Sequence, residues 1–273
     1  MKKKIVLLLI LVLSIFCIAA TGCVTNQVDE TVVLTEENAS LVFSKVAEKV
    51  HGSTVSITCN VNGNTAGGAG VVVSTDGYIL TNYHVVKGAR DNKVWVHFTD
   101  KENPNSTRSY NATIVAEKKD RTDYAKMDLA LVKLDSFSAS TLDLVPVKIK
   151  SEKVKWGEYG IVIGFPKQLG SLVSHAMVSN PSRKILHQIE DTLNTTKEVN
   201  LKTEFITLDA PVNPGNSGGG FFDSNGKLAG IVTLRQYGDG TANKDVVFGI
   251  GYAIPASSIS GYLERYGIKL SAE

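Results

Sequence analysis

From residue 55 onward, hydrophobic residues gather in short runs rich in β-branched side chains, and turn sequences such as STDGY and NVNGN separate them. Apolar runs of this length between Gly, Asn and Asp predict β-strands. A polar stretch near residues 135–155 divides the runs into two groups of six. The first group predicts strands at 55–59, 70–74, 78–81, 94–98, 113–116 and 129–134. The second group predicts strands at 159–164, 172–178, 205–208, 218–222, 228–234 and 248–254.

Many short strands with few helical stretches are typical of all-β barrels and sandwiches. Two groups of similar size predict two barrels with a cleft between them, the first within residues 40–140 and the second within 141–273. The second region ends in SSISGYLERYGIKL, a short amphipathic segment that predicts a C-terminal helix. Ahead of the first barrel, SLVFSKVAEKV has apolar residues at helical spacing, which predicts a helix with Ser40 as its N-cap.

The N-terminus has the layout of a secretory signal peptide over residues 1–22. Three lysines precede an uncharged apolar run of 16 residues, 5–20, which ends in small residues. An uncleaved membrane anchor is the alternative, although a full span needs about 20 apolar residues. The sequence AATGC resembles a bacterial lipoprotein signal, in which Cys23 is lipidated, although Ala20 stands where that pattern prefers leucine. Residues 23–39 are polar and suit a tether.

Charge, cysteine and histidine content argue against a nucleic-acid-binding surface, an intrachain disulfide and a metal site. Without the three N-terminal lysines the chain has 26 basic and 27 acidic residues, a balance that does not suggest a nucleic-acid surface. If Cys17 leaves with the signal peptide and Cys23 is lipidated, Cys59 has no partner for an intrachain disulfide. The five histidines show no metal-ligand spacing, and no cofactor is expected.

The segment PVNPGNSGGG surrounds Ser217 with glycines, as either a surface turn or a bent backbone that presents a nucleophile. A catalytic serine needs a histidine base and a carboxylate. His84 ends an apolar strand in GYILTNYHVV, and Asp128 begins one in MDLALVKL, whereas the other histidines and Asp123, Asp135 and Asp143 suit strand or loop positions. Spacing alone leaves this selection open.

Three motifs, TNYHVV, DLALVKL and NPGNSGGG, stand in the order His, Asp, Ser and resemble those of chymotrypsin-fold serine proteases, in particular the bacterial HtrA/DegP-like branch. GGAGVVVSTDGYILTNYHVV is similar to the family's segment leading to histidine, and TLDAPVNPGNSGGG to its serine loop. VFGIGYAIP is similar to a late strand, and IVIGFP to an Ile-Gly-Asn-Pro segment with Phe165 in place of asparagine. The resemblance covers residues 40–260.

The resemblance implies the chymotrypsin-like fold of two six-stranded antiparallel barrels, with the active site in the cleft between them. It makes Ser217 the nucleophile, His84 the general base and then acid, and Asp128 the residue that orients the imidazole. The backbone N–H groups of Gly215 and Ser217 would form the oxyanion hole.

Specificity follows from the same resemblance. The strand residues Gly251, Tyr252 and Ala253 would line the substrate pocket and favour a small or medium aliphatic side chain. Pro211 stands where trypsin-like members have an acid, which argues against Lys or Arg specificity. No histidine follows His187, which argues against Glu specificity.

Departures from the family pattern bear on regulation. Asn216 stands where zymogen-forming members carry an aspartate, so no cleavage-activated zymogen is expected. A protease domain without a PDZ module is expected, and a homotrimer through the protease domain stays open. Residues 179–204 are either a solvated insertion on the barrel rim or a regulatory or oligomer-contacting loop.

The sequence therefore predicts an exported, membrane-anchored lipoprotein facing outside the cytoplasm, or a secreted or N-terminally anchored form. It would cleave unfolded or exposed polypeptides through an acyl-enzyme, with no nucleic-acid partner. A catalytically idle or gated binder or chaperone is the alternative. An esterase is disfavoured, because Ser217 lacks the Gly-x-Ser-x-Gly setting within an α/β pattern.

Overall fold

The computed structural model describes residues 36–100, 103, 106–115, 128–138, 142–166, 170–190, 196–237 and 246–268. The predicted signal peptide, the lipidation site Cys23 and most of the predicted tether lie outside the described residues. Chain contacts group Ser40–Glu273 into one compact unit, which includes all twelve strands.

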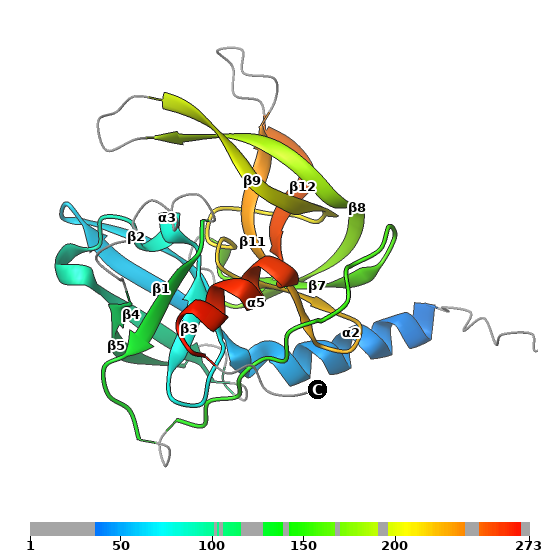
Figure 1. Ribbon diagram of the computed structural model, residues 1–273. Helices are drawn as coiled ribbons and strands as arrows, with labels where there is room; N and C mark the ends of the chain where they lie inside the picture. Colours follow the sequence, from blue (N-terminus) through cyan, green and yellow to red (C-terminus); the bar gives the residue numbers. More distant parts are fainter. Residues whose placement is uncertain are drawn as a thin grey trace, which may run out of the picture. The chain divides into compact units, whose positions relative to one another are not determined.

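The first six strands form a closed antiparallel barrel in the order β1-β2-β3-β6-β5-β4 (Figure 1). Alternation along β4 shows why the sequence closes this way: Val94, Val96 and Phe98 are buried, whereas Trp95 is exposed. The strands are β1 (Thr54–Val61), β2 (Asn64–Val72), β3 (Tyr78–Thr81), β4 (Lys93–Thr99), β5 (Thr107–Ile114) and β6 (Ala130–Leu134).

The last six strands form a second closed antiparallel barrel, in the order β10-β11-β12-β9-β8-β7. The prediction of an all-β fold with two six-stranded barrels is thus confirmed. The strands are β7 (Tyr159–Gly164), β8 (Leu172–Glu190), β9 (Thr196–Asp209), β10 (Gly220–Asp223), β11 (Leu228–Tyr237) and β12 (Val246–Pro255).

Buried side chains form three clusters, and one of them joins the two barrels. Ile57 and Val96 belong to the interior of the first barrel, and Phe221 to that of the second. The third cluster combines residues of both barrels with residues of helices α2 (Glu36–Val50) and α5 (Ala256–Arg265). This shared core holds loops from the two barrels in a fixed relationship. Its members include Val46, Val50, Val71, Leu80, Leu131, Ile161, Phe222, Ile254, Ile259 and Leu263.

Several element boundaries differ from the predictions, among them the start of β2, which lies at Asn64 and not at residue 70. Helix α2 begins at Glu36, so Ser40 lies inside the helix and is not its N-cap; the acidic pair EE at its start suits a first helical turn. Strand β5 begins at Thr107 and not at residue 113. The prediction missed its start because the first residues are polar and exposed and give no apolar signal. Strand β10 begins two residues later than predicted, at Gly220.

The segment 179–204, predicted as a solvated insertion or a regulatory loop, continues strands β8 and β9 as a paired arm (Figure 1). Pairing extends to Glu190 opposite Thr196, with irregular register near Asn180 and Lys184. Ladder hydrogen bonds use only backbone groups, so a polar sequence can form them. A regulatory or oligomer-contacting role for this arm stays one of the two alternatives that the sequence leaves open. Among the helices in the described part of the chain, none is long and apolar enough to cross a membrane.

Candidate active site

His84 lies on a single helical turn, α3 (Tyr83–Val86), directly after β3. Val85 and Val86 on this turn are 4% and 2% exposed and pack into the core of the first barrel. Because these two side chains fix one side of the turn, His84 faces the other way, and its side chain stays 44% exposed. The local sequence thus presents an imidazole at the barrel surface.

The carboxylate of Asp128 holds this imidazole. His84 Nδ1 lies 2.9 Å from Asp128 Oδ2 and 3.1 Å from Oδ1, and the backbone N–H of His84 donates to Oδ1 at 3.1 Å. A carboxylate only accepts hydrogen bonds, so Nδ1 must carry the proton. In the neutral ring, Nε2 is then left as a proton acceptor.

The environment of His84 has opposing effects on its pKa. Desolvation by burial lowers the pKa, but the hydrogen bond and the negative charge of Asp128 together raise it further, and the net result is a pKa above the ordinary value. Asp128 thus stabilises the protonated imidazole, which is the form that a general base becomes after it accepts a proton.

Thr233, on β11, is a contact that sequence reasoning missed. Its hydroxyl donates to Asp128 Oδ2, so the carboxylate is held from both barrels. The side chain of Asp128 is only 12% exposed, and these donors satisfy an otherwise costly buried charge. Thr233 lies inside the apolar run LAGIVTL, where the sequence predicts an ordinary strand residue. The only signal that the sequence offers is a polar residue within an otherwise apolar predicted strand.

Ser217 lies in the loop before β10 and is bound to the first barrel through its backbone. Its carbonyl accepts a 2.7 Å hydrogen bond from the N–H of Ala69 on β2. Its hydroxyl donates to the carbonyl of Thr233 at 3.1 Å. Among the described residues, no hydrogen bond joins the Ser217 hydroxyl to His84. The structure therefore brings His84 and Asp128 into direct contact and links Ser217 to Asp128 through Thr233.

Glycine is required in the serine loop for two reasons. Gly215 has φ +103° and Gly218 has φ +86°, the left-handed region that disfavours side chains. A Cβ at Gly215 would lie 2.2 Å from the carbonyl oxygen of Phe165, and one at Gly218 would lie 2.0 Å from that of Ala69. Both positions thus need the missing side chain for space as well as for conformation.

Three backbone N–H groups of this loop make no hydrogen bond among the described residues. The amides of Asn216, Gly218 and Gly219 donate to backbone carbonyls of Asn213, Val232 and Asn216. The amides of Asn213, Gly215 and Ser217 make no hydrogen bond in the part of the chain that the structure describes. An oxyanion hole needs unpaired backbone donors of this kind, and the two on either side of Asn216 stay its predicted donors.

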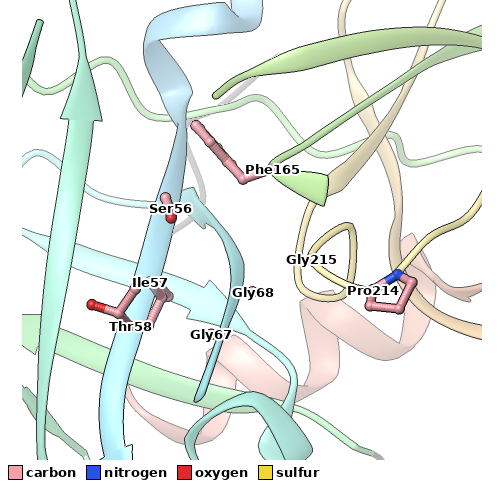
Figure 2. A pocket seen from close by; sticks show the side chains of 8 residues that line it. All are labelled: Ser56, Ile57, Thr58, Gly67, Gly68, Phe165, Pro214 and Gly215. Atoms are coloured by element: carbon pink, nitrogen blue, oxygen red, sulfur yellow. The ribbon is translucent and has the colours of Figure 1, made fainter. Parts of the chain in front are cut away.

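A cavity of about 140 Å³ lies beside this loop, between the barrels (Figure 2). Strands β1 and β2 form one wall, and the ring of Phe165 reaches toward β1 from the other side. No charged residue lines it. Its lining residues are Ser56, Ile57, Thr58, Gly67, Gly68, Phe165, Pro214 and Gly215.

The predicted pocket residues on β12 lie elsewhere and do not line this cavity. Tyr252 is 2% exposed and Ala253 is fully buried, each within a core cluster. The guanidinium of Arg183 lies 6.0 Å from the centre of the Tyr252 ring. A substrate pocket at these residues stays a prediction.

Asn216, the residue at the zymogen position, is 4% exposed, and its side-chain amide donates to the carbonyl of Pro211 at 3.2 Å. The side chain thus helps to hold the loop closed.

Among the described residues, no group of three or more His, Cys, Asp or Glu side chains could hold a metal ion.

Comparison with known proteins places the chain in a family. Residues 68–231 match the model of the trypsin-like peptidase domain. A probable periplasmic serine endoprotease, DegP-like, from Chlamydia trachomatis is 32% identical over 189 residues, which cover 69% of this chain and 31% of that protein. A protein of the same description from Buchnera aphidicola is 33% identical over 72% of this chain and 35% of its own length. The chain thus spans about a third of these curated relatives.

Solved structures show the same fold. The active form of the Rv3671c protease from M. tuberculosis has a TM-score of 0.64 at 23% identity, over 86% of this chain and 89% of that chain. A serine endoprotease from Yersinia pestis has a TM-score of 0.58 at 25% identity, over 82% of this chain and 65% of that chain. By fold and by sequence, this chain belongs to the trypsin-like peptidase family, as an HtrA/DegP-like member.

Proposed function

We propose that the chain is a serine endopeptidase in which His84, Asp128 and Ser217 act as a catalytic triad. The observation that carries this proposal is the 2.9 Å contact between His84 Nδ1 and Asp128, together with a serine loop in which the Gly215 and Ser217 amides make no hydrogen bond to any described residue. The carboxylate fixes the tautomer in which Nε2 can accept the serine proton.

In the proposed reaction, Ser217 Oγ attacks the carbonyl carbon of the peptide bond while His84 Nε2 takes the hydroxyl proton. The N–H groups of Gly215 and Ser217 donate to the resulting oxyanion. The carbon–nitrogen bond then breaks, His84 gives its proton to the leaving amine, and the acyl group stays on Ser217. His84 then takes a proton from water as the water oxygen attacks the acyl carbon. The bond from that carbon to Ser217 Oγ breaks, and His84 gives the proton to Ser217 Oγ, which releases the acid product and restores the enzyme.

The first step requires a rotation of the Ser217 side chain. Its hydroxyl donates to the Thr233 carbonyl and must instead face His84 Nε2. In unliganded enzymes, catalytic hydrogen bonds are often long and form only with substrate. The arrangement fits a resting enzyme that completes its triad when a polypeptide binds.

The proposed substrates are unfolded or exposed polypeptides outside the cytoplasm. The similarity to proteins described as periplasmic DegP-like proteases supports this location. The lipoprotein-like sequence AATGC supports an anchor at Cys23 on the membrane surface. The proposed cleavage of polypeptides and the proposed membrane anchor require no nucleic acid and no cofactor.

The contact between Ser217 and Thr233 also favours a second candidate, a gated or idle protease-fold binder. In that case the serine hydroxyl would keep its bond to the Thr233 carbonyl in the presence of polypeptide. Both candidates predict peptide binding, and only the first predicts cleavage.

The test uses residues 24–273, as wild type and as Ser217→Ala, incubated with reduced, unfolded casein while fragments are followed by mass spectrometry. The proposal expects cleavage by the wild type alone, and the cut sites report the residue preference. Intact casein with a folded wild-type protein would support the gated or idle candidate. Equal cleavage by both proteins would mean either a contaminating protease or a nucleophile other than Ser217.

A further inference from the structure

Asn82, the residue before helix α3, has a fully buried side chain that contacts the backbone of Asp128. Its Nδ2 donates to the Asp128 carbonyl oxygen at 2.9 Å. The same oxygen accepts the backbone N–H of Tyr83 at 3.1 Å. Both lone pairs of this carbonyl are thus bound by consecutive residues of the segment that ends in His84.

These bonds hold Asp128 in an uncommon conformation. Its φ is +51°, in the left-handed region that only a few per cent of non-glycine residues adopt. Residues kept in such regions are held there by their surroundings, and they cluster at functional sites. In this conformation the carbonyl of Asp128 faces Asn82 while its carboxylate faces His84 and Thr233.

The chemistry of Asn82 suits this contact and little else. A carbonyl oxygen only accepts, so the nitrogen end of the amide must face Asp128. The other end, Oδ1, is buried and has no hydrogen-bond partner among the residues that the structure describes. A half-satisfied buried amide costs stability, so packing alone does not explain an asparagine at this position.

From this geometry we propose that Asn82 is a positioning residue for catalysis, which fixes the backbone of Asp128 so that its carboxylate meets His84 Nδ1. The proposal rests on the proposed peptidase function. Asn82 acts from behind the carboxylate and is not expected to touch the substrate. Without its amide, Tyr83 alone would hold the Asp128 carbonyl, and the residue could relax toward a more favourable φ.

The test compares three variants of the full chain. Asn82→Leu keeps the shape of the side chain and loses the donor, and Asn82→Asp puts an acceptor against the Asp128 carbonyl. Val96→Ala is the control, because it removes core volume from the same barrel and makes no hydrogen bond to Asn82, His84 or Asp128 through its side chain. For each variant, kcat and KM are measured on a peptide that the wild type cleaves, together with the melting temperature.

A second readout does not depend on turnover. The pKa of His84 is measured by NMR in the Ser217→Ala background, with and without Asn82→Leu. Asp128 raises this pKa through its hydrogen bond and charge, so a displaced carboxylate should lower it. The expected result is a kcat about tenfold to a hundredfold lower in both Asn82 variants, with KM nearly unchanged, and a lower His84 pKa in Asn82→Leu. Val96→Ala should melt earlier with an unchanged kcat.

A folded Asn82→Leu protein with wild-type kcat and an unchanged His84 pKa would overturn the positioning role. A lower melting temperature for Asn82→Leu with both other values unchanged would assign Asn82 a structural role only. If the wild type cleaves no peptide, the peptidase proposal fails by itself. In that event the His84 pKa still decides whether Asn82 positions Asp128.

Discussion

The Ser217 hydroxyl donates to the backbone carbonyl of Thr233 at 3.1 Å, and the Thr233 hydroxyl in turn donates to Asp128. One strand residue therefore contacts both the proposed nucleophile and the proposed orienting carboxylate. Because Asp128 and His84 come from the first barrel and Ser217 and Thr233 from the second, this residue joins the two halves of the site. The relationship makes Thr233 the first target for mutation.

Thr233→Val should lower kcat/KM about tenfold to a hundredfold, because a hydrogen bond to a charged group contributes about 1.5–3 kcal/mol. Valine keeps the shape of threonine and leaves the backbone carbonyl in place. Steady-state kinetics on a fluorogenic peptide measure the effect. Thr233→Ser, which keeps the hydroxyl, should retain most of the activity. Wild-type kinetics in Thr233→Val would show that this bond does not support Asp128.

Activity should depend on the protonation of His84, because only the neutral ring can accept the serine proton. The pKa of His84 is raised, so kcat/KM should fall with decreasing pH through a midpoint above the ordinary histidine value of about 6.5. Asp128→Asn removes both raising contributions and leaves desolvation, so the midpoint should move to lower pH. The same variant should reduce kcat about 10⁴-fold. A midpoint unchanged by Asp128→Asn would contradict this account.

The effect of this pKa on stability has the opposite sign. A raised folded-state pKa means that the Asp128–His84 pair stabilises the protonated ring. That contribution is complete below the unfolded pKa and is lost as the pH rises through the folded pKa. Chemical denaturation should therefore show a larger difference in the free energy of unfolding between wild type and His84→Ala at pH 5 than at pH 8. These two pH values lie about one unit or more on either side of the ordinary histidine pKa.

Gly215→Ala should reduce kcat about 10²- to 10³-fold, the loss seen when an oxyanion donor is removed. The new Cβ would lie 2.2 Å from the Phe165 carbonyl oxygen and would displace the loop. Gly63→Ala is the matched control, because Gly63 also has positive φ (+84°), and nothing lies within 4 Å of an added Cβ. Kinetics and circular dichroism of both variants separate strain from lost catalysis. Equal losses of kcat would argue against an oxyanion role for this loop.

A partly buried ion network should matter for stability and not for catalysis. Lys150 Nζ lies 3.0 Å from Glu158 and 3.1 Å from Asp223, and the side chain of Asp223 is 2% exposed. Lys150→Met leaves two carboxylates without their cation and should cost about 3–5 kcal/mol. Lys93→Met breaks a pair with side chains 49% and 31% exposed, and should cost about 1 kcal/mol or less. Urea unfolding measures both; a small loss in Lys150→Met would mean that water solvates the network.

The proposed anchor predicts a change in cellular location. Cys23→Ser should prevent lipidation and release the protein from the membrane fraction, because a serine cannot form the thioether to lipid. Metabolic labelling with a clickable fatty acid, followed by membrane fractionation, measures both effects. Cys59→Ser serves as the control, since Cys59 is a buried, free cysteine. Lipid label on the Cys23→Ser protein would contradict the assignment.

The sequence located all twelve strands because burial in both barrels follows short apolar runs, as the alternation along β4 illustrates. It missed the first six residues of β5, the first six of β2 and the paired arm of β8 and β9, where residues with little apolar signal form ladders through their backbones. The start of helix α2, at Glu36, was missed for a related reason, because its first turn is polar and extends the helix beyond the predicted N-cap at Ser40.

The candidate site divides in the same way. Motifs singled out His84, Asp128 and Ser217 because each lies at the end of an apolar strand or in a glycine-rich turn. Thr233 and Asn82 gave no comparable signal, since their roles depend on which strands become neighbours in space. Local sequence cannot report contacts between positions 105 residues apart, such as Asp128 and Thr233.

The central claim, an activated Ser217, is most directly tested by labelling with a fluorophosphonate probe, followed by peptide mass spectrometry. Such probes form a covalent bond only with a nucleophilic serine whose proton can be removed. The account predicts stoichiometric labelling at Ser217, greatly reduced labelling in His84→Ala and none in Ser217→Ala. Labelling at another residue, or an unlabelled Ser217 in protein that still cleaves casein, would contradict it.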